Sequence, residues 1–254
     1  MGQDTPEGGR SPLASPTFLV AALLVVALVI GGMWVVLGRS SSPARTSPVV
    51  SGASTSPSTG GVEAESGGDV AASGDSASAC GLDDSDQSVP GAALPTVPLA
   101  VGEGLEVPSL PGVGPGVTGG VSSCFAHTPT GAVLAGANFM KWFSSKHDLP
   151  EVVTTLMVPG GDRDRIETQV RAEWSGETGS AVNIRGYHFE DWGPDNALVV
   201  LAVSTPAYPN DLVAWPLAMV WVEGDWKVTA PTIDSWGERS IQSLQLEGFV
   251  EWGA

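Results

Sequence analysis

CFAHTPTGAVLAGANF, residues Cys124–Phe139, is where the sequence changes character. The stretch contains one of the two cysteines, a histidine three residues later, and a proline that precedes an apolar run. Thr128 can cap a helix, and Pro129 suits its first turn because the N–H that proline lacks would have no partner there. The segment predicts a loop that leads into a helix. It leaves open whether Cys124 and His127 form an active site or a structural junction.

Two more helices are expected after this one. The apolar positions of the first helix share one face: Val133, Leu134, Ala137 and Met140. Asp148 and Pro150 mark the start of a short second helix, and the stretch 162–174 spaces apolar residues four apart, as a third helix would. Asp162 and Asp164 invite a metal-site hypothesis, but alternating acidic and basic residues are more typical of a solvated first turn.

The rest of the chain changes to a strand-like pattern. The runs 181–192, 195–205 and 212–231 are rich in β-branched and aromatic residues and are separated by turn sequences. Glu223-Gly224-Asp225 is expected to be the turn of a hairpin. Helices followed by an antiparallel meander predict an α+β domain, in which helices cover one face of a curved sheet.

Phe18–Leu37 has no charged residue and, as a helix, would span roughly 30 Å, the hydrocarbon thickness of a bilayer. The run is longer than the apolar core of a cleaved signal peptide, about 7–15 residues, and lacks its basic flank. An uncleaved transmembrane helix is therefore predicted. Arg10 on one side and Arg39 and Arg45 on the other leave the orientation undecided by charge.

The segment 38–79 is dominated by Ser, Gly, Pro and acidic residues, a composition that predicts a disordered linker. The chain has a net charge of −17, and no lysine or arginine occurs between Arg45 and Lys141. Nucleic acids and anionic lipid headgroups need clustered cations, so neither is an expected partner.

Cys80 and Cys124 flank a loop-rich segment whose spaced prolines and glycines predict an extended path over a surface. Its glycine-rich part, 112–120, lacks the Lys-Ser/Thr ending of a phosphate loop. A disulfide is the simplest interpretation of the two cysteines, and it places this part of the chain outside the cytoplasm, with the N-terminus inside. A zinc site and a Cys124–His127 dyad are alternatives, but the first lacks paired ligand spacing and the second lacks a third group.

The expected organisation has five parts: a short disordered N-terminus (1–17), a transmembrane helix (18–37), the linker (38–79), the pinned extended segment (80–124) and an α+β globular domain (125–254).

Several motifs carry a resemblance to a family. CGL at Cys80, GPGV, the segment from Cys124 to Phe139, GDWKV and the closing GFVEWG resemble an uncharacterised family of actinobacterial single-pass membrane proteins that is often associated with mobile or conjugative elements. The order of helices and strands is also similar to the nuclear-transport-factor-2-like cone, which conjugation scaffolds use outside the membrane. The resemblance implies no specific activity.

Cone folds also host isomerases and dehydratases, which makes Tyr187, His188 and Asp195 candidate catalytic residues. Neighbouring residues of a strand point to opposite faces, so Tyr187 and His188 cannot both line a cavity, and Asp195 lies in a turn sequence. We therefore expect no catalytic residue, cofactor or metal. Trp192 and Trp236 lie among turn residues and are candidate partner contacts, whereas Trp174, Trp221 and Trp226 are expected in the core.

The function expected from the sequence is that of a membrane-anchored, extracytoplasmic scaffold that binds other envelope proteins, as in a conjugation apparatus. Homo-oligomerisation is compatible with this role. The alternative is a small-molecule binder or enzyme that uses a cone cavity.

Overall fold

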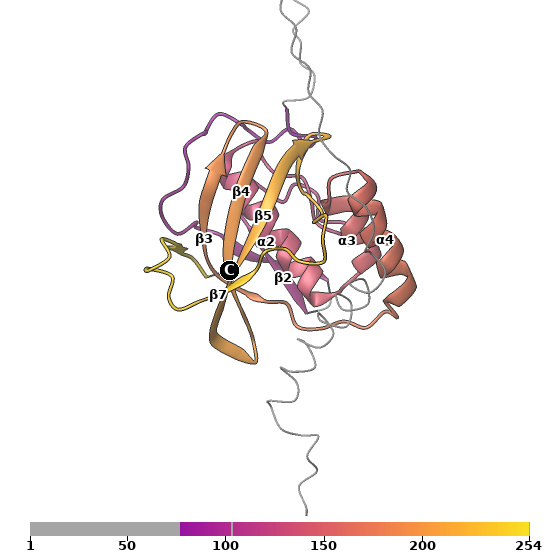
Figure 1. Cartoon of the computed structure of the whole chain (residues 1–254). Coiled ribbons are helices and arrows are strands. Elements are labelled where there is room, and N and C mark those ends of the chain that lie inside the picture. The colour runs from indigo at the N-terminus through magenta and orange to yellow at the C-terminus, as the bar shows by residue number, and fades with distance from the viewer. Residues whose placement is uncertain (1–76, 103, 254) are drawn as a thin grey trace, which may run out of the picture. The chain divides into compact units, whose positions relative to one another are not determined.

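The computed structural model describes residues 77–102 and 104–253, which form an α+β domain with three helices packed on an antiparallel sheet (Figure 1). This confirms the predicted fold class of the C-terminal region. The predicted membrane helix Phe18–Leu37 and most of the predicted linker lie outside the described residues. Within the described ranges, no helix combines the length and the hydropathy that crossing a membrane requires.

The described helices and strands are, in chain order, β1 (Val97–Gly102), β2 (Leu105–Ser109), α2 (Pro129–Ser145), α3 (Leu149–Leu156), α4 (Gly161–Glu173), β3 (Asn183–Trp192), β4 (Asn196–Thr205), β5 (Tyr208–Val222), β6 (Asp225–Val228), β7 (Arg239–Ile241) and β8 (Val250–Glu251). β1 and β2 form a hairpin of their own. The larger sheet has the order β6-β5-β4-β3-β8, and β7 also pairs with β5.

The central strand β4 is covered on both faces. Alternate residues such as Val199 and Leu201 belong to the main core with α2, whereas Val200 and Ala202 pack in a second cluster with residues of the C-terminal segment. That segment starts in β7, next to β5, and ends in β8, next to β3. It must therefore pass across the sheet, which explains why β4 is an uninterrupted apolar run.

Helix α2 begins as the sequence predicts. Thr128 Oγ1 accepts a hydrogen bond from the N–H of Gly131 at 3.0 Å, and Pro129 is the first helical residue. The predicted single apolar face is too narrow, because α2 is buried almost all round, including Asn138 and Trp142. The sheet covers one side, and the segment that precedes α2 covers another.

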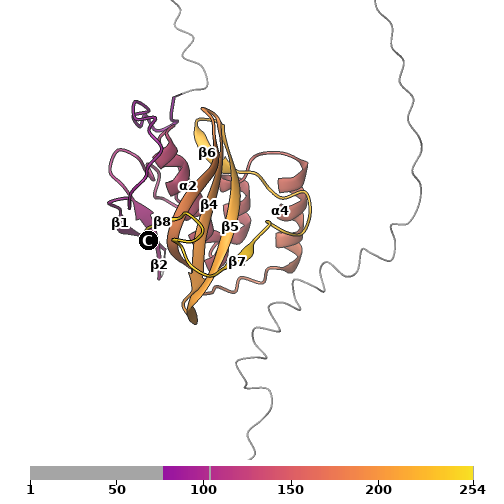
Figure 2. The same ribbon diagram turned by 60° about the vertical axis from the view of Figure 1, so that its left-hand side comes forward.

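The segment between Cys80 and Cys124 was predicted to run over the surface, and this is wrong in one respect. Its β1–β2 hairpin packs against α2, and Leu105 and Val107 are fully buried there. In Figure 2 the hairpin lies beside the sheet, next to α2. The segment therefore supplies part of the core, because short strands with prolines still bury every second residue.

Two local predictions need correction. Trp174 is half-buried beside the end of α4, where its indole N–H donates to the carbonyl of Glu177, so it is not a core residue, whereas Trp221 and Trp226 are. The hairpin between β5 and β6 turns at two residues, Glu223 and Gly224, whose φ angles are both positive. Asp225 belongs to β6 and is buried.

Candidate functional site

The junction at Cys124–Thr128 joins the preceding segment to the start of α2. Cys80 and Cys124 form a disulfide, which confirms the predicted pairing. The thiolate that a nucleophile or a zinc ligand requires is therefore not available from either cysteine. Gly116 packs directly against the disulfide, since a Cβ atom there would lie 2.5 Å from Cys80 Sγ. Gly116 thus meets a packing requirement at the disulfide, and Gly112, Gly114 and Gly120 of the same stretch adopt the positive φ of turn residues.

The buried carboxylate of Asp225, about 100 residues later in the chain, accepts hydrogen bonds from the same junction. Asp225 Oδ2 accepts the N–H of Cys124 at 2.7 Å, and Oδ1 accepts the N–H groups of Phe125 and Trp226, both at 2.8 Å. Burial raises the pKa of Asp225, and the three N–H donors oppose that shift. The carboxylate links β6 to a segment about 100 residues earlier, so its role is structural.

His127 is enclosed by the same junction. Its ring stacks on Trp221 with centroids 3.9 Å apart, and Nε2 lies 2.7 Å from the carbonyl oxygen of Pro194 and 3.2 Å from Asp195 Oδ1. A carbonyl oxygen can only accept, so Nε2 carries the hydrogen and donates it. The residue is 8% exposed and is held between the β3–β4 loop and β5. His127 is a loop residue, as predicted, but a buried one.

Next to the junction, Ser122 is the centre of a buried network of hydrogen bonds. Ser122 donates to Asn138 Oδ1 at 2.6 Å, accepts from the indole N–H of Trp142 at 2.7 Å, and its carbonyl accepts from Asn138 Nδ2 at 2.7 Å. All three side chains are buried. The polar atoms of these side chains therefore find their hydrogen-bond partners inside the protein, as a buried polar network requires.

The residues weighed as catalytic do not converge. Tyr187 is buried on the core face, where its hydroxyl donates to the carbonyl of Ala92 at 2.7 Å and burial raises its pKa to about 12. His188 points to the other face and packs on Phe249 with ring centroids 4.3 Å apart. Asp195 lies in the β3–β4 loop, where its Oδ1 is 3.2 Å from His127 Nε2. The three side chains thus occupy three different places.

The two candidate contact tryptophans are half-buried. Trp192 lies with its ring centroid 5.6 Å from that of Trp226, and Trp236 lies 5.6 Å from Phe139 and 5.8 Å from Phe143. Each ring therefore has one side on the core and another at the surface. This position fits an aromatic contact residue but does not test the prediction.

Metal binding finds no support in the part of the chain that the structure describes, where no group of three or more His, Cys, Asp or Glu side chains comes together. Asp162 and Asp164 instead form ion pairs with Arg165 and Arg163. This agrees with a solvated first turn of α4.

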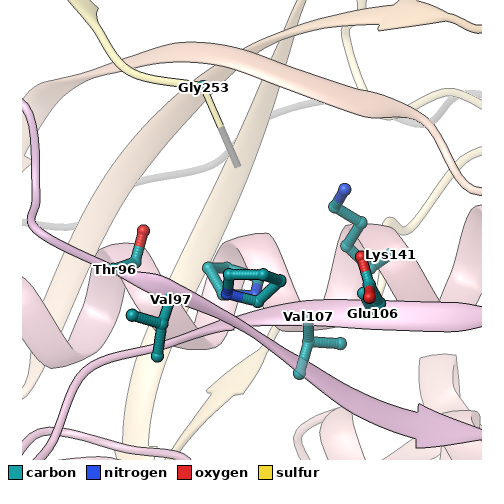
Figure 3. Close-up of a pocket in the computed structure, with 8 residues that line it drawn as sticks. Thr96, Val97, Glu106, Val107, Lys141 and Gly253 are labelled. Atoms are coloured by element: carbon teal, nitrogen blue, oxygen red, sulfur yellow. The ribbon is translucent and has the colours of Figure 1, made fainter.

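A surface groove around Lys141 was not anticipated from the sequence. We call it the Lys141 groove. It consists of two adjoining hollows that share Lys141 and Glu106. The first, of about 270 Å³, lies between the β1–β2 hairpin and Gly253; the second, of about 530 Å³, lies between His147 and the loop 178–181. Figure 3 shows Lys141 and Glu106 at one end of the first hollow and Thr96 at the other.

Lys141 differs from the other cations of the domain. Burial lowers its pKa, and the nearby charge of Glu106 acts in the opposite direction. Among the lysines and arginines within the described ranges, Lys141 is the one without a hydrogen bond or an ion pair. One feature of the sequence marks this residue: it is the first cation after a long stretch without lysine or arginine.

The fold and the junction define an α+β domain with one disulfide in the described residues, and a comparison with known families assigns it to a family. Residues 61–251 match the model of a family described as a domain of unknown function, DUF8175, and the chain belongs to this family. No curated protein and no solved structure gives a significant match. The description of the family names no function, so the function must be argued from the residues.

Proposed function

We propose that this chain is a single-pass membrane protein whose C-terminal domain lies outside the cytoplasm and binds other envelope proteins without catalysing a reaction. Phe18–Leu37 would be the anchor, with the N-terminus in the cytoplasm and residues 38–79 as a flexible linker. The disulfide supports the extracytoplasmic side, because such bonds persist in oxidising compartments. An assembly of a mobile or conjugative element is the setting that the sequence resemblance favours.

One observation carries the non-catalytic part of the proposal. The chemically suggestive side chains of the Cys124–Thr128 junction are engaged in internal contacts: a disulfide, the hydrogen bonds of Asp225 and the stacked ring of His127. A catalytic side chain must be able to contact the substrate and either transfer a proton or donate an electron pair to it. Groups that hold the fold in this way favour a rigid binding module.

The alternative function, a ligand site or an isomerase-like enzyme in a cone cavity, requires open space between the helices and the sheet. Gly136 of α2 approaches the sheet so closely that a Cβ atom there would lie 3.3 Å from Leu217 Cδ1. Val133, Leu134 and Leu201 are fully buried in the same interface. This packing favours the binding module over a cavity enzyme.

The topology can be tested with protease added to intact protoplasts. We expect cleavage within 38–79 and release of a fragment of the domain's size, because exposed linkers are the preferred sites of proteolysis. A domain that stays protected until the membrane is opened would contradict the extracytoplasmic placement.

The binding role can be tested by placing a photo-crosslinking amino acid at Trp192 or at Trp236 of the full chain in its native envelope. We expect a discrete protein adduct from at least one of the two positions. Leu246, which is 80% exposed, is the matched control and should give none. Adducts of equal yield from all three positions would show unspecific collision and would count against a contact surface there.

A further inference from the structure

Within residues 77–102 and 104–253, Lys141 of the groove is a cation without a hydrogen bond or an ion pair, in a domain of strongly acidic character. The chain has 28 acidic and 11 basic residues, and an ammonium group in such a sequence easily finds a carboxylate. Lys146, five residues later, does so with Glu177 at 4.0 Å. Lys141 instead lies partly buried beside Glu106, and no ion pair joins the two. Its ammonium group is therefore the available positive charge of the groove.

The walls around Lys141 are apolar on one side. Pro98 and Pro108, which lie opposite each other in the β1–β2 hairpin, line the first hollow with Lys141 and Glu106. Pro98 is an exposed residue at this place. A ligand that places an anion on Lys141 can thus cover an apolar surface with the group next to it.

We propose that the Lys141 groove binds a carboxylate that is attached to a small apolar group, with the carboxylate on Lys141 Nζ and the apolar group against Pro98 and Pro108. Such a group occurs at the C-terminus of an apolar peptide and in short aliphatic acids. The site goes beyond the proposed function and does not depend on Trp192 or Trp236.

The charge of the groove favours a monoanion. One ammonium group neutralises one carboxylate, and Glu106 lies close enough to repel a second negative charge. A phosphate group carries more charge and usually requires several donors or a bidentate arginine. The net charge of −17 disfavours a polyanion such as nucleic acid still further.

The β1–β2 hairpin does not favour a peptide bound as an added strand. Pro98 and Pro108 lie directly opposite each other, and both lack an N–H group. In an antiparallel pair, such residues suit a non-hydrogen-bonded position, where the missing N–H groups point to the outer edges. Both edges therefore lose a donor, which hinders strand addition. Recognition rests on the carboxylate and its apolar neighbour.

The test is a titration of the purified full-length chain with the peptide acetyl-Ala-Ala-Val-Ala-Val, which ends in a free carboxylate, followed by calorimetry. Its C-terminal amide is the matched ligand without the charge, and isovalerate is the small-acid probe. We expect the carboxylate peptide to bind at least about tenfold more tightly than the amide, the range for hydrogen bonds to a charged group. Binding of isovalerate with the same affinity would assign the site to small acids, whereas tighter peptide binding would assign it to chain ends.

Three variants place the binding at Lys141. Lys141→Met should remove the preference for the carboxylate, and Lys141→Arg should retain a measurable part of it. Lys146→Met removes the same charge from the same end of α2 but not from the groove lining, and should leave the affinity unchanged. Equal affinity for the acid and the amide, or equal loss in the two Met variants, would overturn the proposal. The crosslinking at Trp192 and Trp236 would still decide the binding role independently.

Discussion

The Cys124–Thr128 junction and the Lys141 groove lie at opposite ends of α2 and differ in how their charges are satisfied. At the junction, Asp225 is 7% exposed and accepts three backbone N–H groups. In the groove, Lys141 has no hydrogen-bond or ion-pair partner among the residues that the structure describes. A fully satisfied polar group stabilises a fold, whereas an unsatisfied one is available to a ligand. We therefore assign a structural role to the junction and propose a ligand-binding role for the groove.

The largest effect on stability should come from the disulfide. Cys80→Ser with Cys124→Ser opens a ring with a sequence separation of 44 residues, and loop-closure entropy predicts a loss of roughly 4 kcal/mol in the free energy of unfolding. Denaturant unfolding of the full chain measures this loss. Ser123→Ala, next to the bond, is the control. A loss below about 1 kcal/mol would show that the junction does not depend on the bond.

Asp225→Ala should be next in size. It leaves the N–H groups of Cys124, Phe125 and Trp226 without their acceptor inside the protein, and we expect a loss of about 3 kcal/mol or more. Glu223→Gln, at the exposed turn of the same hairpin, is the control and should change stability by less than about 0.5 kcal/mol. Equal effects of the two variants would contradict a structural role for Asp225.

The raised pKa of Asp225 gives the junction a pH dependence of known sign. The folded state keeps the proton to a higher pH than the unfolded state, whose pKa is near 3.8. This group's contribution to stability therefore increases as the pH falls through the raised folded pKa, and levels off below about 3.8. The difference in unfolding free energy between the wild type and Asp225→Asn should grow along this range. A difference that shrinks on acidification would mean that the folded pKa is lowered.

Tyr187→Phe should have a smaller effect, because it removes one hydrogen bond to the carbonyl of Ala92 and leaves the ring in place. We expect a loss of about 1 kcal/mol. Faster hydrogen exchange in the segment 88–94 of the variant would show that this bond holds the segment on the core. If hydrogen exchange in this segment is unchanged, the loss of stability arises in the sheet and not in the attachment of the segment.

Lys141→Met should have the smallest effect on stability, within about 0.5 kcal/mol, because no described residue gives its ammonium group a hydrogen bond or an ion pair. Thermal melting of the full chain without ligand tests this expectation. A loss of 2 kcal/mol or more would place Lys141 among the groups that hold the fold, and the contrast with Asp225 would disappear.

The sequence predicted the elements whose signals are local. The cap at Thr128, the helix from Pro129 and the strand runs follow from propensity and periodicity, and the pairing of Cys80 with Cys124 follows from their number and setting. The environment of Asp225 could not be predicted, because its three donors include two from a segment about 100 residues away. As part of a Glu-Gly-Asp sequence, it looks like a turn residue.

The Lys141 groove escaped prediction for a similar reason. Lys141 occurs on a helix beside Trp142, where a lysine is ordinary, and its surroundings come from β1, β2 and the loop 178–181. The absence of an ion pair is a property of the assembled domain. In contrast, Cys124 and His127 stand close in sequence and suggest chemistry, yet tertiary contacts engage both in holding the fold.

The most direct test of the contrast between the two regions is hydrogen exchange of the full-length chain with and without saturating acetyl-Ala-Ala-Val-Ala-Val. We expect the peptide to slow exchange in the β1–β2 hairpin and around Lys141, while the exchange of Cys124–Thr128 stays the same. Slowed exchange at Cys124–Thr128 together with an unchanged hairpin would contradict the account, because it would place recognition at the junction and not in the Lys141 groove.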